Sequence, residues 1–120
     1  MQKKILHIDN GADSIRIVKT ILETEGHTVF TACNEQNCLL LVKNKKPDLV
    51  LLEVMMGNCC GWELYQKIRR IDKNINVVFL STIPISEERK EDLLNSGIAD
   101  YIIKPIKEEN LLKAVNTILS

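Results

Sequence analysis

Aromatic residues are scarce in this 120-residue chain, at 4% of the total, and neither sign of charge is in excess. Sixteen basic residues balance sixteen acidic ones, so the formal net charge is zero. Without a basic stripe or a long run of like charges, binding to nucleic acid or to a membrane surface has no electrostatic basis. No apolar run is long enough to cross a bilayer. We therefore expect partners that are neither nucleic acid nor membrane.

The four cysteines lack the spacing of a metal or redox site. Cys33, Cys38, Cys59 and Cys60 form neither a CxxC pair nor a Cys/His zinc pattern. The adjacent pair cannot form a disulfide with each other without strain. The N-terminal segment MQKKILHIDN reaches a charged residue too soon for a secretory signal peptide. These features predict reduced thiols in a cytoplasmic protein.

Composition and length fit one ordinary globular domain. Hydrophobic residues make up 45% of the chain and charged residues 27%, which is typical of such domains. We expect residues 1–120 to form a single domain. The sequence leaves open whether that domain works alone or as one piece of a longer protein.

Apolar, strand-like segments alternate with segments of helical periodicity. The five expected strands are KKILHID, HTVFTA, DLVLLE, NVVFLS and ADYIIK. Each is followed by a helical pattern, and the last helix is expected from about Glu108 to Leu119. Nearly continuous apolar strands are typical of parallel sheets that are covered on both faces. Right-handed crossovers then favour a doubly wound α/β fold with helices on both faces and strand order 2-1-3-4-5.

Several residues are expected to mark the ends of the helices. Asp13, Asn34 and Ser86 can cap the first, second and fourth helices through their side chains. Gly26 is expected to end the first helix, and Pro47 the second. The third helix is expected to bury a stripe that contains Leu64, Ile68 and Ile71.

Polar side chains are expected at the carboxyl ends of four of the five strands. In an open parallel sheet these ends meet at one edge, where ligands bind. The residues are Asp9 and Asn10 after the first strand, Glu53 after the third, Ser81 and Thr82 after the fourth, and Lys104 after the fifth. Two carboxylates, an amide, two hydroxyls and one ammonium would therefore converge, which indicates a functional site.

Four segments around these residues are distinctive: ILHIDN, PDLVLLEVMMGNCCGWEL, VVFLST and DYIIKP. With them the chain resembles, over nearly its whole length, the receiver domain of two-component response regulators. The resemblance implies a flavodoxin-like receiver fold. It also implies a signalling role without enzymatic activity and a sensor kinase or another signalling protein as partner. A homodimer through the fourth helix, fifth strand and last helix is a further expectation.

The resemblance also assigns roles to the residues at the strand ends. In the family, an aspartate after the third strand accepts a phosphoryl group, and acids after the first strand help to hold Mg²⁺. A hydroxyl residue and a lysine bind the phosphoryl oxygens, and an aromatic residue rotates on activation. The matching positions are Glu53 for the acceptor, Asp9, Asn10 and Glu53 for the metal, Ser81, Thr82 and Lys104 for the phosphate pocket, and Tyr101 for the switch.

This chain departs from the family pattern at the residues that carry the chemistry. Glu53 replaces the acceptor aspartate, Asn10 replaces the second metal-binding acid, and Thr82 replaces a smaller residue. Gly57 and Cys60 replace a frequent proline and a frequent aspartate. The charge of the site becomes −1 rather than −2, which weakens the case for a dication. We therefore expect no cofactor, with Mg²⁺ bound weakly if at all.

The longer Glu53 side chain is expected to face Lys104 across the site. It could then act as a partial phosphate mimic, or the site could be inactive and the fold retained as a binding scaffold. The scaffold interpretation is favoured, and both give an atypical receiver that acts by phosphorylation-independent protein–protein contact. The alternative is a working Mg²⁺-dependent phospho-acceptor. A flavin carrier of similar architecture is disfavoured because NGADS makes a poor phosphate loop and aromatic residues are few.

Three further residues are expected to serve packing. His7 lies in the first strand, two residues before Asp9, and a lone histidine there is expected to be a core residue with satisfied hydrogen bonds. Trp62 and Tyr65 open the third helix and are expected to pack along it.

Overall fold

The computed structural model describes residues 2–56 and 59–120, without the side chains of residues 59 and 60. The predicted reduced thiols of Cys59 and Cys60, and the family departures at Gly57 and Cys60, concern residues or side chains outside this described part. Within the described part of the chain, neither Cys33 nor Cys38 takes part in a disulfide.

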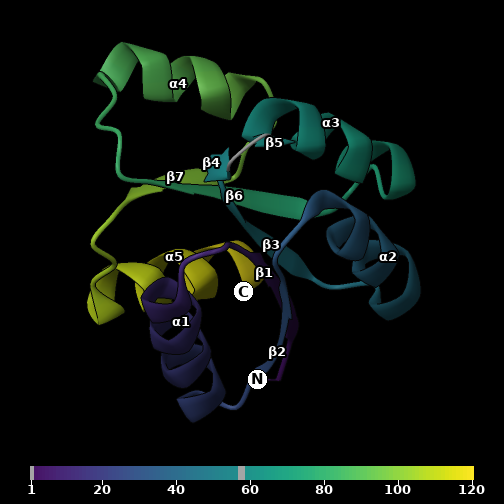
Figure 1. Cartoon of the computed structure of the whole chain (residues 1–120). Helices are drawn as coiled ribbons and strands as arrows, with labels where there is room; N and C mark the ends of the chain where they lie inside the picture. Colours follow the sequence, from purple (N-terminus) through teal and green to yellow (C-terminus); the bar gives the residue numbers. More distant parts are fainter. Residues whose placement is uncertain (1, 57–58) are drawn as a thin grey trace.

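Five parallel strands form the central sheet (Figure 1). Their order across the sheet is β2-β1-β3-β6-β7, which is the predicted order 2-1-3-4-5 once these five are counted along the chain. The strands are β1 (Lys4–Ile8), β2 (Thr28–Ala32), β3 (Leu49–Glu53), β6 (Asn76–Ser81) and β7 (Asp100–Ile103). The order reverses between β1 and β3, so a crevice between the loops that follow them is the expected place for a ligand.

Five helices cover the two faces of the sheet, as predicted. They are α1 (Ala12–Thr24), α2 (Glu35–Lys45), α3 (Gly61–Ile71), α4 (Glu87–Asn95) and α5 (Glu108–Leu119). In Figure 1, α1 and α5 lie on one side of the sheet and α2, α3 and α4 on the other. In the described part of the chain, no helix is both long and apolar enough to span a bilayer.

Alternation along the strands divides the apolar core into two layers. Ile5 packs with α1 and α5, whereas Leu6 and Ile8 pack with α2 and α3. Leu64 and Ile68 of α3 are fully buried, but Ile71 at the end of that helix is 38% exposed and does not complete the predicted stripe. Burial on both faces explains why the strands are continuously apolar.

Two of the three predicted helix caps are present. The Asn34 side chain accepts a hydrogen bond from Asn37 N at 2.8 Å, and Ser86 Oγ accepts one from Arg89 N at 3.1 Å. The prediction for Asp13 was wrong, because α1 begins earlier with Gly11 as its N-cap. Gly11 N donates to Asp9 Oδ1 at 2.9 Å, so the residue that starts the helix is anchored to the site.

A short antiparallel pair interrupts the connection from β3 to α3. It joins β4 (Met55–Met56) to β5 (Cys59–Cys60), and the sequence patterns did not predict it. Two-residue strands are too short to carry a periodicity of two.

Gly97→Ala is expected to lower the free energy of unfolding by about 2 kcal/mol. Gly97 has a φ of +108°, and an added Cβ would lie 2.5 Å from the Tyr65 hydroxyl oxygen, which Arg69 Nη1 holds at 3.0 Å. Gly26→Ala is the matched control, since its φ is +89° but no atom lies within 4 Å of the added Cβ. It should cost about 1 kcal/mol, from backbone strain alone. Equal losses in urea unfolding would show that Tyr65 moves aside at no cost.

Candidate functional site

The Lys104 ammonium bridges the two carboxylates predicted to face it. Lys104 Nζ donates to Glu53 Oε1 at 2.7 Å and to Asp9 Oδ2 at 2.8 Å. Both carboxylates belong to buried residues, and we call these three residues the acid pocket. The sequence-based expectation that Glu53 faces Lys104 is therefore met by the geometry.

Three strand ends at one edge of the sheet bring the acid pocket together. Asp9 directly follows β1, Glu53 ends β3 and Lys104 directly follows β7. Asp9 N donates to Ala32 O at 3.0 Å, and Lys104 N donates to Ser81 O at 2.7 Å. These backbone bonds extend the sheet by one residue at β1 and at β7, whereas Glu53 lies within β3, so the sheet fixes the starting points of all three side chains.

Every carboxylate oxygen in the acid pocket already has a donor. Asp9 Oδ1 accepts from Gly11 N, and Glu53 Oε2 accepts a long hydrogen bond of 3.5 Å from Met55 N. The remaining oxygen of each carboxylate accepts from Lys104. The ammonium of Lys104 therefore already neutralises one of the two negative charges that would attract a metal ion.

Electrostatics in the acid pocket favour the charged forms of Asp9 and Lys104. Burial is the largest influence on Asp9 and opposes its ionisation. Its contacts with His7, Lys104 and the backbone of Gly11 outweigh that effect and hold its pKa well below the usual range. Burial likewise opposes the charge of Lys104, but its hydrogen bonds to Asp9 and Glu53 raise its pKa above the ordinary value.

The structure does not bring Asn10 and Thr82 into the acid pocket. Both residues are exposed, and within residues 2–56 and 59–120 neither is hydrogen-bonded to the three residues of the pocket. Among these described residues, no group of three or more His, Cys, Asp and Glu side chains is placed to hold a metal ion. Because Asn10 is neutral and Lys104 stands between the two acids, the residues present do not fit Mg²⁺ well.

Ser81 and Tyr101 both bond to the backbone of Ile83, in the loop between β6 and α4. Ser81 Oγ accepts from Ile83 N at 3.0 Å, and the Tyr101 hydroxyl donates to Ile83 O at 2.8 Å. Tyr101 is 7% exposed and therefore packs inward. Sequence reasoning found the two side chains but missed Ile83, because a backbone carbonyl leaves no residue-type signal.

His7 is a core residue, as expected, but the expectation that its hydrogen bonds are satisfied was wrong. Its Nε2 lies 3.3 Å from Asp9 Oδ2 and the residue is fully buried. Neither ring nitrogen, however, makes a hydrogen bond of good geometry with any described residue. The His7 ring therefore lies beside the acid pocket with unused hydrogen-bonding capacity. Trp62 and Tyr65, in contrast, pack together as predicted, with ring centroids 5.3 Å apart.

A comparison with protein-family models matches residues 5–116 to the response regulator receiver domain. The chain belongs to this family. The receiver domain is 30% identical over 121 residues to protein PilH of Pseudomonas aeruginosa, covering 98% of both chains. It is 32% identical over 120 residues to the probable transcriptional regulator ycf27 of Porphyridium aerugineum, but spans only 49% of that protein. The chain spans about half the length of several relatives that it matches.

Comparison with solved structures also relates the chain to response regulators. The receiver domain superposes with a TM-score of 0.87 on a two-component response regulator from Clostridium difficile, at 34% identity and with 98% and 96% of the two chains covered. A CheY-like receiver domain protein from Methanospirillum hungatei gives a TM-score of 0.87 at 27% identity, with 99% and 94% covered. The chain is therefore a receiver domain in both sequence and fold.

Magnesium is expected to leave this receiver domain unchanged at millimolar concentrations. The amides of Gly11 and Met55 donate to the carboxylates of Asp9 and Glu53, so their chemical shifts would report a bound ion directly. The ammonium of Lys104 already compensates the charge that would attract the dication. In an amide NMR titration at constant ionic strength, a saturable shift at both positions would contradict the expectation.

Proposed function

We propose that this receiver domain acts through protein–protein contact without being phosphorylated. The observation that carries the proposal is the Lys104 bridge, at 2.7 Å to Glu53 and 2.8 Å to Asp9. In the family, the lysine binds a phosphoryl oxygen and the acids bind the metal. Here the same three side chains are satisfied by one another.

Phosphoryl transfer depends mainly on the placement of the acceptor. The extra methylene of Glu53 moves its carboxylate by roughly one bond length, and a misplacement of about 1 Å can slow a reaction about a hundredfold. The Lys104 hydrogen bond further occupies one of the Glu53 oxygens. Both effects act against attack on a phosphodonor.

The inward position of Tyr101 supports a fixed conformation of the switch. In the family, this aromatic residue packs inward in the active state, and here its hydroxyl is bonded to Ile83. The phosphate mimic is only partial, because Ser81 Oγ accepts from Ile83 N and, among the described residues, makes no bond to Glu53. Of the residues expected to form the phosphate pocket, Glu53 therefore binds Lys104 but not the hydroxyl of Ser81.

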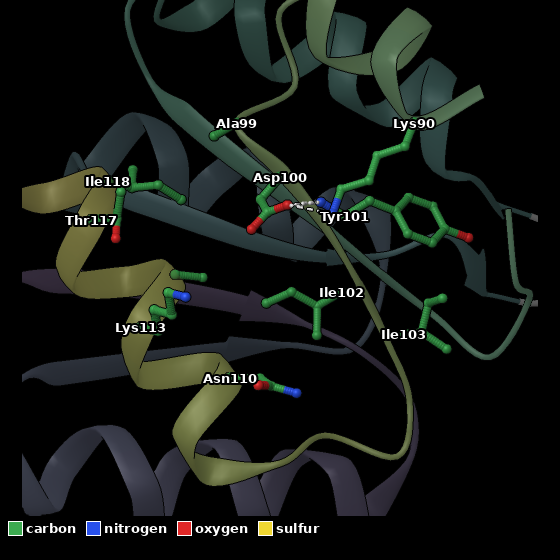
Figure 2. Close-up of a pocket in the computed structure, with 11 residues that line it drawn as sticks. Lys90, Ala99, Asp100, Tyr101, Ile102, Ile103, Asn110, Lys113, Thr117 and Ile118 are labelled. Atoms are coloured by element: carbon green, nitrogen blue, oxygen red, sulfur yellow. Dashed lines mark hydrogen bonds and ion pairs between the residues drawn. The ribbon is translucent and has the colours of Figure 1, made fainter. Parts of the chain in front are cut away.

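The face formed by α4, β7 and α5 is the contact surface that we propose for a signalling protein or for a second copy of the chain. Figure 2 shows this face, with the Tyr101 ring pointing away from α5. Lys90 Nζ of α4 lies 3.5 Å from Asp100 Oδ1 of β7, and Ile103 is 46% exposed. The surface thus combines a charged pair with an accessible apolar side chain, as contact surfaces commonly do.

The test is incubation of the domain with acetyl phosphate and Mg²⁺, followed by intact mass spectrometry. We expect no gain of a phosphoryl group, with or without the metal. A receiver domain that has an acceptor aspartate serves as the positive control for the reagents. Labelling of the unmodified chain on Glu53 would instead establish a working phospho-acceptor.

A further inference from the structure

A cavity of about 460 Å³ lies between β6, α3 and α4, with Tyr101 in its wall. The chain has one tryptophan, two tyrosines and two phenylalanines, and three of these line this cavity: Trp62, Phe79 and Tyr101. Aromatic residues are thus rare in the sequence but concentrated here. The volume falls in the range of about 300–1,000 Å³ that is usual for small-molecule sites.

The remaining walls are mainly aliphatic, and one of them is a loosely packed helix. Ile83 and Ile85 from the β6–α4 loop and Leu93 from α4 line the cavity. None of the residues of α4 is buried. Leu93 packs against the core but is only partly buried, so the described part of the chain covers the apolar side of this helix incompletely.

Arg89 supplies a cation to the lining of the cavity. It lines the cavity and is exposed, and its guanidinium makes no ion pair with any residue in 2–56 or 59–120. Asp92 lies one turn further along α4 and also lines the cavity, again without an ion pair among those residues. An unpaired guanidinium beside an aromatic cavity suits a carboxylate, sulfonate or similar anion.

We propose that this cavity binds a small aromatic or aliphatic molecule that carries one anionic group. The rings of Trp62, Phe79 and Tyr101 would contact its apolar body, and Arg89 would pair with its anion. Tyr101 forms one wall and its hydroxyl holds Ile83, another wall residue. An occupant would therefore contact the switch residue directly, through a site separate from the acid pocket.

The test uses two dyes that differ in a single charged group. 8-Anilino-1-naphthalenesulfonate has apolar rings and a sulfonate, whereas N-phenyl-1-naphthylamine has the same rings without it. Trp62 is the only tryptophan of the chain, so energy transfer from it reports binding of the dye to the domain, and the Arg89 variant reports the place. We expect one molecule of the sulfonate per chain, bound about fivefold more tightly than the neutral dye, the ratio that an exposed ion pair can give.

Arg89→Gln should abolish the difference between the two dyes. Arg70→Gln is the matched control, since Arg70 is an exposed cation of α3 that does not line this cavity, and it should keep the difference. Neither variant alters the acid pocket, so the outcome is independent of whether Glu53 can be phosphorylated.

Two results would overturn the proposal. They are binding of several dyes per chain, and an Arg89→Gln variant that still prefers the sulfonate. Sedimentation velocity tests whether a second copy of the chain occupies the cavity instead. A dimer that dissociates when the dye is added would show that it does, and would contradict the proposal.

Discussion

Replacing Lys104 by methionine is expected to lower the free energy of unfolding by about 3 kcal/mol at neutral pH. Methionine has a similar length but no charge, so the buried carboxylates of Asp9 and Glu53 would lose the only ammonium that contacts them among the described residues. An uncompensated buried charge costs far more than the net value of the ion pair itself. Urea unfolding of the parent and the variant measures the loss.

The pH dependence identifies the cause of that loss. The pKa of Asp9 is lowered in the folded state, so its contribution is present above about pH 4 and is lost as the pH falls further. The pKa of Lys104 is raised, so its contribution is present up to about pH 10 and is lost at higher pH. The stability difference between parent and Lys104→Met should therefore shrink below pH 4 and above pH 10.

Two controls accompany the Lys104 experiment. Lys107→Met removes an exposed lysine three residues away and should change stability by no more than about 0.5 kcal/mol. Adding Glu53→Gln and Asp9→Asn to Lys104→Met removes the uncompensated charges and should recover much of the loss. A Lys104→Met variant as stable as Lys107→Met would show that the acid pocket contributes nothing to the fold.

Restoring three family residues is expected to convert the domain into a phospho-acceptor. Glu53→Asp shortens the acceptor and draws it away from Lys104. Asn10→Asp changes the charge of the site from −1 to −2, which favours a dication, and Thr82→Ala reduces the bulk beside Ser81. The triple variant should gain one phosphoryl group from acetyl phosphate on the new aspartate, and only with Mg²⁺ present, as measured by intact mass.

Single variants divide that effect into its parts. Glu53→Asp alone should be labelled slowly at best, because Asn10 still contributes no charge. Without metal, the added carboxylate of Asn10→Asp should slightly destabilise the fold, since like charges then lie close together. A triple variant that folds but stays unlabelled would mean that other departures from the family, such as Gly57 and Cys60, also matter.

Local sequence patterns predicted the sheet and the acid pocket because both depend on residue type and spacing. Apolar runs located the five strands, and the polar residues at their ends located Asp9, Glu53 and Lys104. The caps at Asn34 and Ser86 were predicted for the same reason: a short polar side chain stands directly before a helical pattern.

Features that depend on the backbone were not predictable in this way. The start of α1 depends on a hydrogen bond from Gly11 N to Asp9, which competes with the capping signal at Asp13. Likewise, Tyr101 and Ser81 both bond to the main chain of Ile83, and any residue there could offer the same groups. The unsatisfied ring of His7 is a matter of side-chain orientation, which sequence spacing does not determine.

The Lys104 bridge also has a consequence for the order in which the domain can assemble. Lys104 contacts a residue 95 positions earlier in the chain and another 51 positions earlier. During synthesis, β1 and β3 emerge long before Lys104, so a partly made chain that paired them would place two acids together without their cation. That penalty opposes early closure of the central strands, and the last strand removes it. The electrostatics of the acid pocket therefore favour folding of the complete chain over folding of its first half.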